Sequence, residues 1–451
     1  MDNKVEIIET GEGLVNIKNQ CPNCGSYQLK YNEKLGKIFC SFCNNTFEPK
    51  EIEGIETDLK ELTTQRIGSG ALDINPEFNN IMTFKCPSCG AEVVFDTKSS
   101  TQTKCHWCHS ILTINERIPN GAVPDVILPF KITKEEAMEE INKFVDNKRF
   151  FARSDFKNNF TAENTVGVYL PYLLVDVNAH CKLTGEGEKY LQTNQVDNVS
   201  ANAYRIEREF NITIDDLSIE SNSNILDKNT NNTNNIINSI MPFDTENCVK
   251  FESNYLVGYS CEKRDVNISN LKEKADKQVK DIIRASMKSS INQYDRGVSW
   301  KKQDINIFGS QWIAAYLPVW LYSFQQKDGT IHYIAVNART KETHGSIPPD
   351  NFKLNLWTIV IVSVLFILLF ILPEENKEDS INIVSGVCIA VICANIFIKQ
   401  SYRSKSLRHN YEKETKYNVT DLVSNDTFIG RRNGLSSSYI AYRNDNKAFG
   451  A

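Results

Sequence analysis

Eight of the thirteen cysteines of this chain occur in pairs with the spacing Cys-x-x-Cys. They are Cys21, Cys24, Cys40 and Cys43 in a first block and Cys86, Cys89, Cys105 and Cys108 in a second. In each block fifteen residues separate the two pairs, so the second block repeats the first. Four thiolates on two tight turns can complete a tetrahedral shell around zinc. The spacing therefore predicts two structural zinc ions.

Redox chemistry and a catalytic metal are the alternatives for these pairs. Redox chemistry fits a single Cys-x-x-Cys, but it does not account for two pairs at a fixed separation. A catalytic zinc needs an open coordination position, and four cysteines leave none. His106 and His109 flank one pair and could replace a ligand, although ordinary surface positions are the simpler interpretation. With strand-like runs between the pairs, we expect small β zinc ribbons over residues 1–47 and 85–118.

Zinc ribbons often bind nucleic acid, and that use requires a basic, aromatic surface. Residues 1–120 contain 12 Lys or Arg against 16 Asp or Glu, and zinc tetrathiolates add negative charge. One local cluster combines basic and aromatic residues, namely Tyr27, Lys30, Tyr31, Lys34, Lys37 and Phe39. No longer basic stripe is present in this region. The charge balance favours contact with proteins over contact with nucleic acid.

Two uncharged apolar runs, at 356–372 and 381–398, occupy most of the segment 354–399. As helices each would be about 26 Å long, close to the ~30 Å hydrocarbon core of a bilayer. Trp357 lies at the start of the first run, next to Leu356, and can sit at the headgroup level where Trp is favoured. We expect a two-helix transmembrane hairpin. A buried hairpin in a soluble core is the alternative, but helices of that kind normally carry a polar stripe.

The charges around the two apolar runs predict their orientation. The loop between them is acidic, with Glu374, Glu375, Glu378 and Asp379 against Lys377. The flanks are basic, with Lys353 before the hairpin and Lys399, Arg403, Lys405 and Arg408 after it. By the positive-inside rule, the N-terminal domains and the C-terminal tail lie in the cytoplasm of a multi-pass cell-membrane protein.

The composition of the whole chain agrees with a minor membrane part. The net charge is −5 and the mean hydropathy is −0.37, values that are typical of soluble domains and argue against a general nucleic-acid binder. The N-terminal stretch lacks the apolar core of a signal peptide. A reducing compartment favours metal binding over disulfides for the paired cysteines.

Residues 119–350 alternate strand and helix patterns in two similar rounds. Thr133 and Glu136 form a capping box ahead of a first amphipathic helix, and residues 269–289 form a second. Each helix precedes a long apolar strand that contains Tyr-Leu-Pro, at 169–171 and at 316–318. The repeat predicts a duplicated α+β region.

The remaining segments are predicted to be connections. Residues 48–84 form an acidic linker, and residues 221–239 form an Asn-rich loop. Residues 400–451 are expected to be a tail that is first basic and then flexible. Pro171 predicts an edge position or a bulge for its strand.

Motifs for catalysis do not stand out. The sequence has no Gly-x-x-x-x-Gly-Lys-Ser/Thr loop, no Gly-x-Ser-x-Gly turn and no His-Glu-x-x-His helix. Five cysteines outside the pairs are isolated: Cys181, Cys248, Cys261, Cys388 and Cys393. We therefore expect a protein that is not an enzyme, with no catalytic or organic-cofactor residues.

The order of two Cys-Pro-x-Cys-Gly ribbons, two Tyr-Leu-Pro strands and a late membrane hairpin resembles a family of bacterial membrane proteins. That family is labelled by its transcription-factor-IIB-type, rubredoxin-like zinc ribbon. Similar proteins are encoded beside phage-shock-protein-A-like and stomatin/flotillin-type proteins. The resemblance implies a membrane anchor that recruits such cytoplasmic scaffold proteins, and it carries over only the eight cysteine ligands.

The sequence thus predicts a multidomain chain: two small β zinc ribbons, a duplicated α+β region and an α-helical transmembrane hairpin. The expected function is a zinc-ribbon adaptor at the membrane lipid bilayer, acting in envelope stress. The alternative is a membrane-tethered nucleic-acid-binding protein for DNA attachment, replication or transcription.

Overall fold

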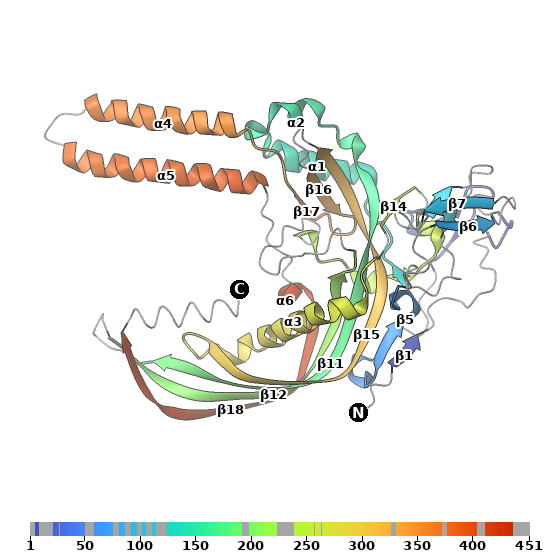
Figure 1. Ribbon diagram of the computed structural model, residues 1–451, viewed down its shortest axis with the longest axis horizontal. Helices are drawn as coiled ribbons and strands as arrows, with labels where there is room; N and C mark the ends of the chain where they lie inside the picture. Colours follow the sequence, from blue (N-terminus) through green and yellow to red (C-terminus); the bar gives the residue numbers. More distant parts are fainter. Residues whose placement is uncertain are drawn as a thin grey trace.

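The computed structural model describes residues 5–8, 21–26, 28–49, 58–74, 81–85, 92–96, 102–104, 111–113, 124–191, 198–222, 239–256, 258–262, 264–325, 331–371, 377–403 and 411–435. The chain folds into several β-sheets and helices, dominated by one mixed sheet of eleven strands (Figure 1).

The strands of the main sheet are β1 (Val5–Ile8), β5 (Gln65–Gly68), β10 (Val126–Ile127), β11 (Val166–Tyr190), β12 (Asn198–Glu220), β13 (Val249–Lys250), β14 (Ser260–Cys261), β15 (Val298–Gln325), β16 (Ile331–Asn337), β17 (Thr343–Gly345) and β18 (Lys416–Leu435). Three small sheets contain β2 (Leu29–Asn32), β3 (Lys37–Cys40) and β4 (Thr46–Phe47), then β6 (Ile81–Lys85) with β7 (Glu92–Asp96), and β8 (Gln102–Lys104) with β9 (Ile111–Thr113). The α-helices are α1 (Lys134–Asp146), α2 (Ser154–Asn159), α3 (Ile268–Ser286), α4 (Asn351–Ile371), α5 (Lys377–Arg403) and α6 (Tyr411–Glu414).

Four long antiparallel strands, in the order β15, β11, β12 and β18, form a curved arm of the main sheet (Figure 1). Register shifts occur between Val175 and Val177, between Asn178 and Ala179, and between Glu209 and Asn211. Such bulges bend a sheet and increase its twist. Helix α3 lies along the concave side of the arm, where Leu271, Val279 and other apolar residues of its buried face pack on the strands.

The two Tyr-Leu-Pro motifs lie directly opposite each other in the centre of the sheet. In the antiparallel pair β11 and β15, Leu170 faces Leu317, and each tyrosine faces the proline of the other motif. The neighbouring strands repeat this symmetry, because β14 runs parallel to β11 at Tyr169 and β10 runs parallel to β15 at Tyr316. The repeated pattern of the sequence is therefore arranged in space about a local two-fold axis.

The expectation that Pro171 marks an edge strand or a bulge is wrong, because β11 is a central strand. Pro171 lies where the neighbour of β11 changes from β14 to β12, and Pro318 lies where the neighbour of β15 changes from β10 to β16. Proline has no backbone N–H to donate, so it fits a position between two ladders. Each proline still accepts through its carbonyl, from Ser221 N and from Ala338 N.

Helix α1 begins where the sequence predicts. Thr133 Oγ1 accepts a hydrogen bond from Glu136 N at 3.3 Å, and Glu136 Oε2 accepts one from Thr133 N at 3.0 Å. This reciprocal capping box satisfies two backbone donors at the start of the helix. The inner face of α1 buries Ala137, Ile141 and Val145 in the core.

Two segments that were expected to be connections belong to the main sheet. The linker 48–84 contains β5, which pairs with β1 and β15, and also the start of β6. The tail 400–451 contains β18, which pairs with β12 over most of its length, so the expectation of a flexible tail is wrong there. Both strands gain their stability from partners far away in the sequence, which a local pattern does not reveal. Most of the Asn-rich loop, residues 223–238, lies outside the described residues.

Helices α4 and α5 lie side by side and antiparallel, and they project from the rest of the molecule (Figure 1). Among the described residues, Ile383–Tyr402 is the one helical stretch long and apolar enough to cross a membrane. The described apolar part of α4, Asn351–Ile367, is shorter. Asn395 Nδ2 donates to Thr358 Oγ1 at 2.5 Å and to the Leu354 carbonyl at 3.3 Å, which joins the two helices.

Candidate metal centre

The four cysteines of the first block lie on two turns with the same backbone design. The N–H of Gly25 donates to the carbonyl of Cys21 at 2.8 Å, and the N–H of Asn44 donates to the carbonyl of Cys40 at 2.9 Å. Gly25 and Asn44 both have a positive φ, of 73° and 60°. Gly and Asn are the residues that adopt this left-handed conformation most readily. The cysteine spacing does not single out Asn44, although it occupies the same position in its turn as Gly25 does in the other.

The two turns bring four sulfur atoms together. Cys21 Sγ lies 3.5 Å from Cys43 Sγ, and Cys24 Sγ lies 3.7 Å from Cys40 Sγ. All four sulfurs lie within 4.8 Å of one another. A zinc–sulfur bond of about 2.3 Å requires sulfur–sulfur edges of about 3.8 Å in a tetrahedron. The first block could therefore hold one metal ion with four cysteine ligands.

A backbone donor favours the thiolate form of one of the four cysteines, Cys43. A hydrogen bond from the backbone N–H of Asn45 is the main cause that lowers the pKa of Cys43 to about 6. Thiolate is the form of cysteine that binds metals. Asn45 was also not singled out from the sequence, because its contribution comes from the backbone and depends on the turn.

The first ribbon is attached to the main domain by aromatic packing. The rings of Tyr31 and Tyr255 have their centroids 5.1 Å apart, and both side chains are buried. Cys21 and Cys40 belong to the same buried cluster as Tyr255. The metal site therefore lies next to the main domain and is not carried on a separate, independent module.

The ligands predicted in the second block lie outside the described residues, as do His106 and His109. The strands on either side of them are described. Lys85 at the end of β6 pairs with Glu92 at the start of β7, and Lys104 pairs with Ile111 between β8 and β9. In the sequence, Cys86 and Cys89 lie between β6 and β7, and Cys105 and Cys108 lie between β8 and β9.

Two members of the basic and aromatic cluster of the first ribbon are engaged within the protein. Tyr31 is buried against Tyr255, and Lys37 forms an ion pair with Glu48. Tyr27 lies outside the described residues. A nucleic-acid platform requires exposed rings beside free cations, and Tyr31 and Lys37 do not provide this.

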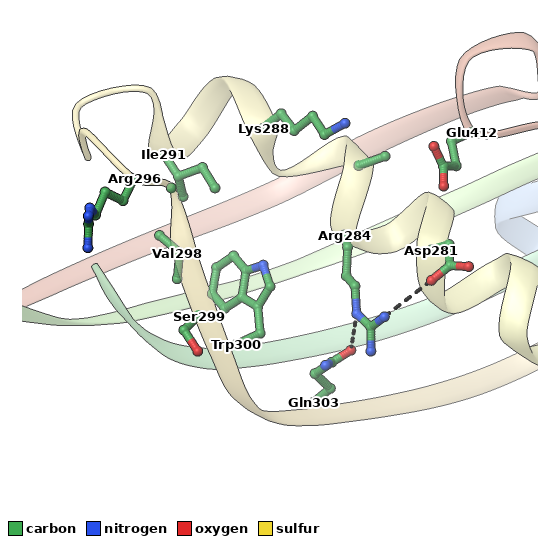
Figure 2. Close-up of a pocket in the computed structure, with 12 residues that line it drawn as sticks. Asp281, Arg284, Lys288, Ile291, Arg296, Val298, Ser299, Trp300, Gln303 and Glu412 are labelled. Carbon is green, nitrogen blue, oxygen red and sulfur yellow. Dashed lines mark hydrogen bonds and ion pairs between the residues drawn. The ribbon is translucent and has the colours of Figure 1, made fainter. Parts of the chain in front are cut away.

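A cavity of about 210 Å³ lies between the C-terminal half of α3 and the start of β15 (Figure 2). The Arg284 side chain extends into this cavity and is held by two hydrogen bonds. Its Nε donates to Gln303 Oε1 at 2.9 Å, and its Nη1 donates to Asp281 Oδ1 at 3.2 Å. The volume is below the range of about 300–1,000 Å³ that is typical of ligand pockets. We assign no ligand to this cavity.

Three carboxylates meet at a bulge between β11 and β12. Asp176, Asp215 and Asp216 lie within 4.8 Å of one another, and Asp176 accepts hydrogen bonds from Asp216 N at 2.9 Å and from Gln311 Nε2 at 3.2 Å. Burial, followed by the charge of Asp216, raises the pKa of Asp176 to about 7. Burial also raises the pKa of Asp216 to about 6.

This cluster predicts a pH dependence of stability. Because the folded pKa values lie above the ordinary value of 3.8, the folded protein binds more protons than the unfolded chain between pH 3.8 and about 7. The free energy of unfolding contributed by the cluster is therefore highest below this window and falls as the pH rises through it, by about 1.4 kcal/mol per unit of pKa shift. The charged groups near the carboxylate cluster are Lys416, Glu246 and Arg66. Of these, Arg66 donates a hydrogen bond to Gln311.

We expect the substitution Asp216→Asn to raise the melting temperature at about pH 8 and to change it little at about pH 3, below the ordinary carboxyl pKa of 3.8. Asparagine tolerates the φ of 52° at this position, so the backbone is retained. The measurement is thermal unfolding of the full chain in detergent at both pH values. Asp421→Asn is the matched control, since Asp421 has a φ of 55° but is exposed. An equal gain at both pH values would show that charge is not the cause.

No family model and no solved structure matches this chain. It is similar to the "Uncharacterized protein YdjG" of Bacillus subtilis (strain 168), with 22% identity over 353 residues. The matched region covers 78% of this chain and 96% of that protein. The similarity thus extends over nearly the whole relative, and it assigns no activity.

Proposed function

We propose that this chain is a membrane-anchored zinc-ribbon adaptor that gathers cytoplasmic scaffold proteins at the bacterial membrane as part of an envelope-stress response. In this proposal each cysteine block holds one structural zinc ion. Helices α4 and α5 form a transmembrane hairpin, and both the N-terminal domains and β18 lie in the cytoplasm. The expected partners are the phage-shock-protein-A-like and stomatin/flotillin-like proteins implied by the family resemblance.

The observation that carries the anchor is the exposure of α5. Only 6% of its apolar stretch Ile383–Tyr402 is buried within the molecule. An apolar core helix of a soluble protein would be mostly buried, because exposed apolar surface costs about 25 cal/mol per Å² in water. In a bilayer this apolar surface contacts lipid instead of water, so the free-energy cost of exposing it disappears. Helix α4 supports the same conclusion, since Ile359 and Ile367 are also exposed.

The polar residues of the hairpin support its placement in lipid. Asn395 is buried between the helices, where Thr358 and the Leu354 carbonyl accept both of its amide hydrogens. A polar side chain in a hydrocarbon environment must find such partners inside the protein. At the base of the hairpin, where α4 begins and α5 ends, Lys399 Nζ donates to Asn355 Oδ1 at 2.8 Å. A charged group at this position can reach the lipid headgroups.

The first ribbon offers a surface for a protein partner. Leu35 is 57% exposed and Phe42 is 71% exposed, and Phe42 lies inside the Cys40–Cys43 turn, which the metal would make rigid. Exposed aromatic residues on a rigid support are typical anchors of protein interfaces. Tyr31, in contrast, is already used to attach the ribbon to the main domain.

A pull-down of the full chain from detergent-solubilised membranes tests this proposal, with half of each sample treated with nuclease. We expect co-purified proteins that persist after nuclease and that are lost from the variant Phe42→Ala. Phe308→Ala is the control, because Phe308 is 44% exposed on the distant β15. If nuclease removes everything that co-purifies, a membrane-tethered nucleic-acid binder replaces the adaptor.

A further inference from the structure

The short helix η4 (Arg149–Phe151), which follows α1, presents a large apolar side chain to solvent at the base of the hairpin. Phe150 is 58% exposed, and next to it Trp357 of α4 is 48% exposed. The rings of Phe150 and Trp357 have centroids 6.5 Å apart. Two large apolar residues from two separate segments therefore form one exposed patch, which we call the collar.

The position of η4 in the collar is fixed by both helices of the hairpin. Phe151 N donates to Tyr402 Oη of α5 at 3.2 Å, and the Phe151 carbonyl accepts from Asp350 N at 2.7 Å. Lys353 Nζ of α4 donates to the Phe150 carbonyl at 2.9 Å. Phe151 itself packs against the buried core. Phe150 is thus held outward on a rigid turn and is not a loose loop residue.

The position of Trp357 on α4 indicates how deep the collar would lie in a bilayer. This residue lies six positions after the start of α4, which is about 9 Å along the helix axis. Trp prefers the headgroup region of a bilayer. Since Phe150 lies beside Trp357, a hairpin inserted with Trp357 at that level also places Phe150 there.

The charges around the collar match an anionic surface. Lys353 Nζ lies 4.0 Å from the centre of the Phe150 ring. Arg149 precedes Phe150 in η4, and Lys399 of α5 donates to Asn355 of α4. Of the nearby acids, Asp146 pairs with Arg149 at 3.3 Å, and Asp350 Oδ1 accepts from the backbone N–H of Lys353. Cations above an aromatic patch are the arrangement by which proteins contact anionic lipid headgroups.

We infer that η4 is a second membrane contact, in which Phe150 enters the interface of an anionic bilayer beside Trp357 while Lys353 and Arg149 meet the lipid phosphates. This inference rests on the proposed anchor. It means that the α+β region is held directly against the membrane surface at α1, and is not suspended from the hairpin by a free connection.

Photocrosslinking of the full chain tests this inference. Phe150, Ile367 and Phe42 are each replaced, in separate variants, by p-benzoylphenylalanine, and the protein is reconstituted into vesicles of phosphatidylglycerol and phosphatidylcholine. After irradiation, lipid adducts are quantified by mass spectrometry. We expect adducts at position 150 in a yield within about threefold of that at position 367 in the hairpin. We expect none at position 42, which is 71% exposed on the first ribbon.

The outcomes separate the two proposals. Adducts at position 367 without adducts at position 150 overturn the inference and leave the anchor intact. An absence of adducts at position 367 overturns both. Equal adducts at positions 42 and 150 would mean general adsorption and also overturn the inference.

The lipid composition of the adducts tests the charge part of the inference. In the mixed vesicles we expect the adducts at position 150 to be enriched several-fold in phosphatidylglycerol relative to those at position 367, because only the collar lies beside the cations Lys353 and Arg149. The double variant Arg149→Gln, Lys353→Gln should remove this enrichment without lowering the yield at position 367. An equal share of phosphatidylglycerol at positions 150 and 367 contradicts an anionic partner.

Discussion

The substitution Cys40→Ser should lower the zinc content of the purified full chain from two ions to one. Cys40 is fully buried beside the other three sulfurs, and a serine hydroxyl stays protonated and does not replace a thiolate ligand. Structural zinc contributes about 10–16 kcal/mol to the folding of isolated zinc fingers at neutral pH, so its loss should unfold the ribbon. The measurement is metal analysis of the detergent-purified protein by mass spectrometry.

Two further variants complete this test. Cys181→Ser is the control, because Cys181 is equally buried but lies in the core of the main sheet, away from the four sulfurs. It should retain the full zinc content. Cys86→Ser, in the second block, should also lower the content by one ion. If Cys40→Ser keeps the zinc of the parent protein, the proposed metal centre is wrong. If only Cys86→Ser keeps it, the second block holds no metal.

The substitution Asp426→Ala should release β18 from the arm of the main sheet. Asp426 accepts from Arg208 Nη1 at 2.6 Å and from Tyr294 Oη at 2.7 Å, and the Arg208 side chain is only 1% exposed. Removing one partner of a buried ion pair costs about 3–5 kcal/mol, because the other charge remains buried and unpaired. That is enough to detach an edge strand without unfolding the rest.

Limited proteolysis measures this release. In the Asp426→Ala variant we expect cleavage within Lys416–Leu435 to become at least tenfold faster, while the fragment that contains β11 and β15 remains intact. Asp304→Ala is the matched control. Its partner is Lys302, and the two side chains are 54% and 71% exposed, so the effect should stay within about 0.5 kcal/mol. Unchanged cleavage in the Asp426→Ala variant would show that the Arg208 pair does not hold β18.

The features that the sequence predicts well are those that depend on neighbours in the chain. The Cys-x-x-Cys turns of the first block are formed by five or six consecutive residues, so their spacing is enough to predict the cluster of sulfurs. The start of α1 is predicted because Thr133 and Glu136 satisfy each other's backbone groups locally. The exposed apolar helix α5 follows from length and composition alone.

The features that the sequence does not reveal depend on distant partners. β5 has four residues and is a strand because β1 and β15 lie on either side of it. The centre of β18 is exposed on both faces, so it has no alternation of apolar and polar residues to recognise. The pairing of the two Tyr-Leu-Pro motifs depends on the register of β11 against β15, which no local signal specifies.

The hairpin and the curved arm extend toward the same side of the molecule, while β6 and β7 lie on the opposite side (Figure 1). The distal arm is charged, with Lys302, Asp304, Glu186 and Arg432 among its residues. A hairpin standing upright in a bilayer would push these charges into the hydrocarbon, which excludes them. In the proposed anchored state the hairpin would therefore tilt, as membrane helices commonly do by about 20° and up to about 40°. The tip of the arm would then rest at the membrane surface as a second support and would restrict rotation of the molecule about its anchor.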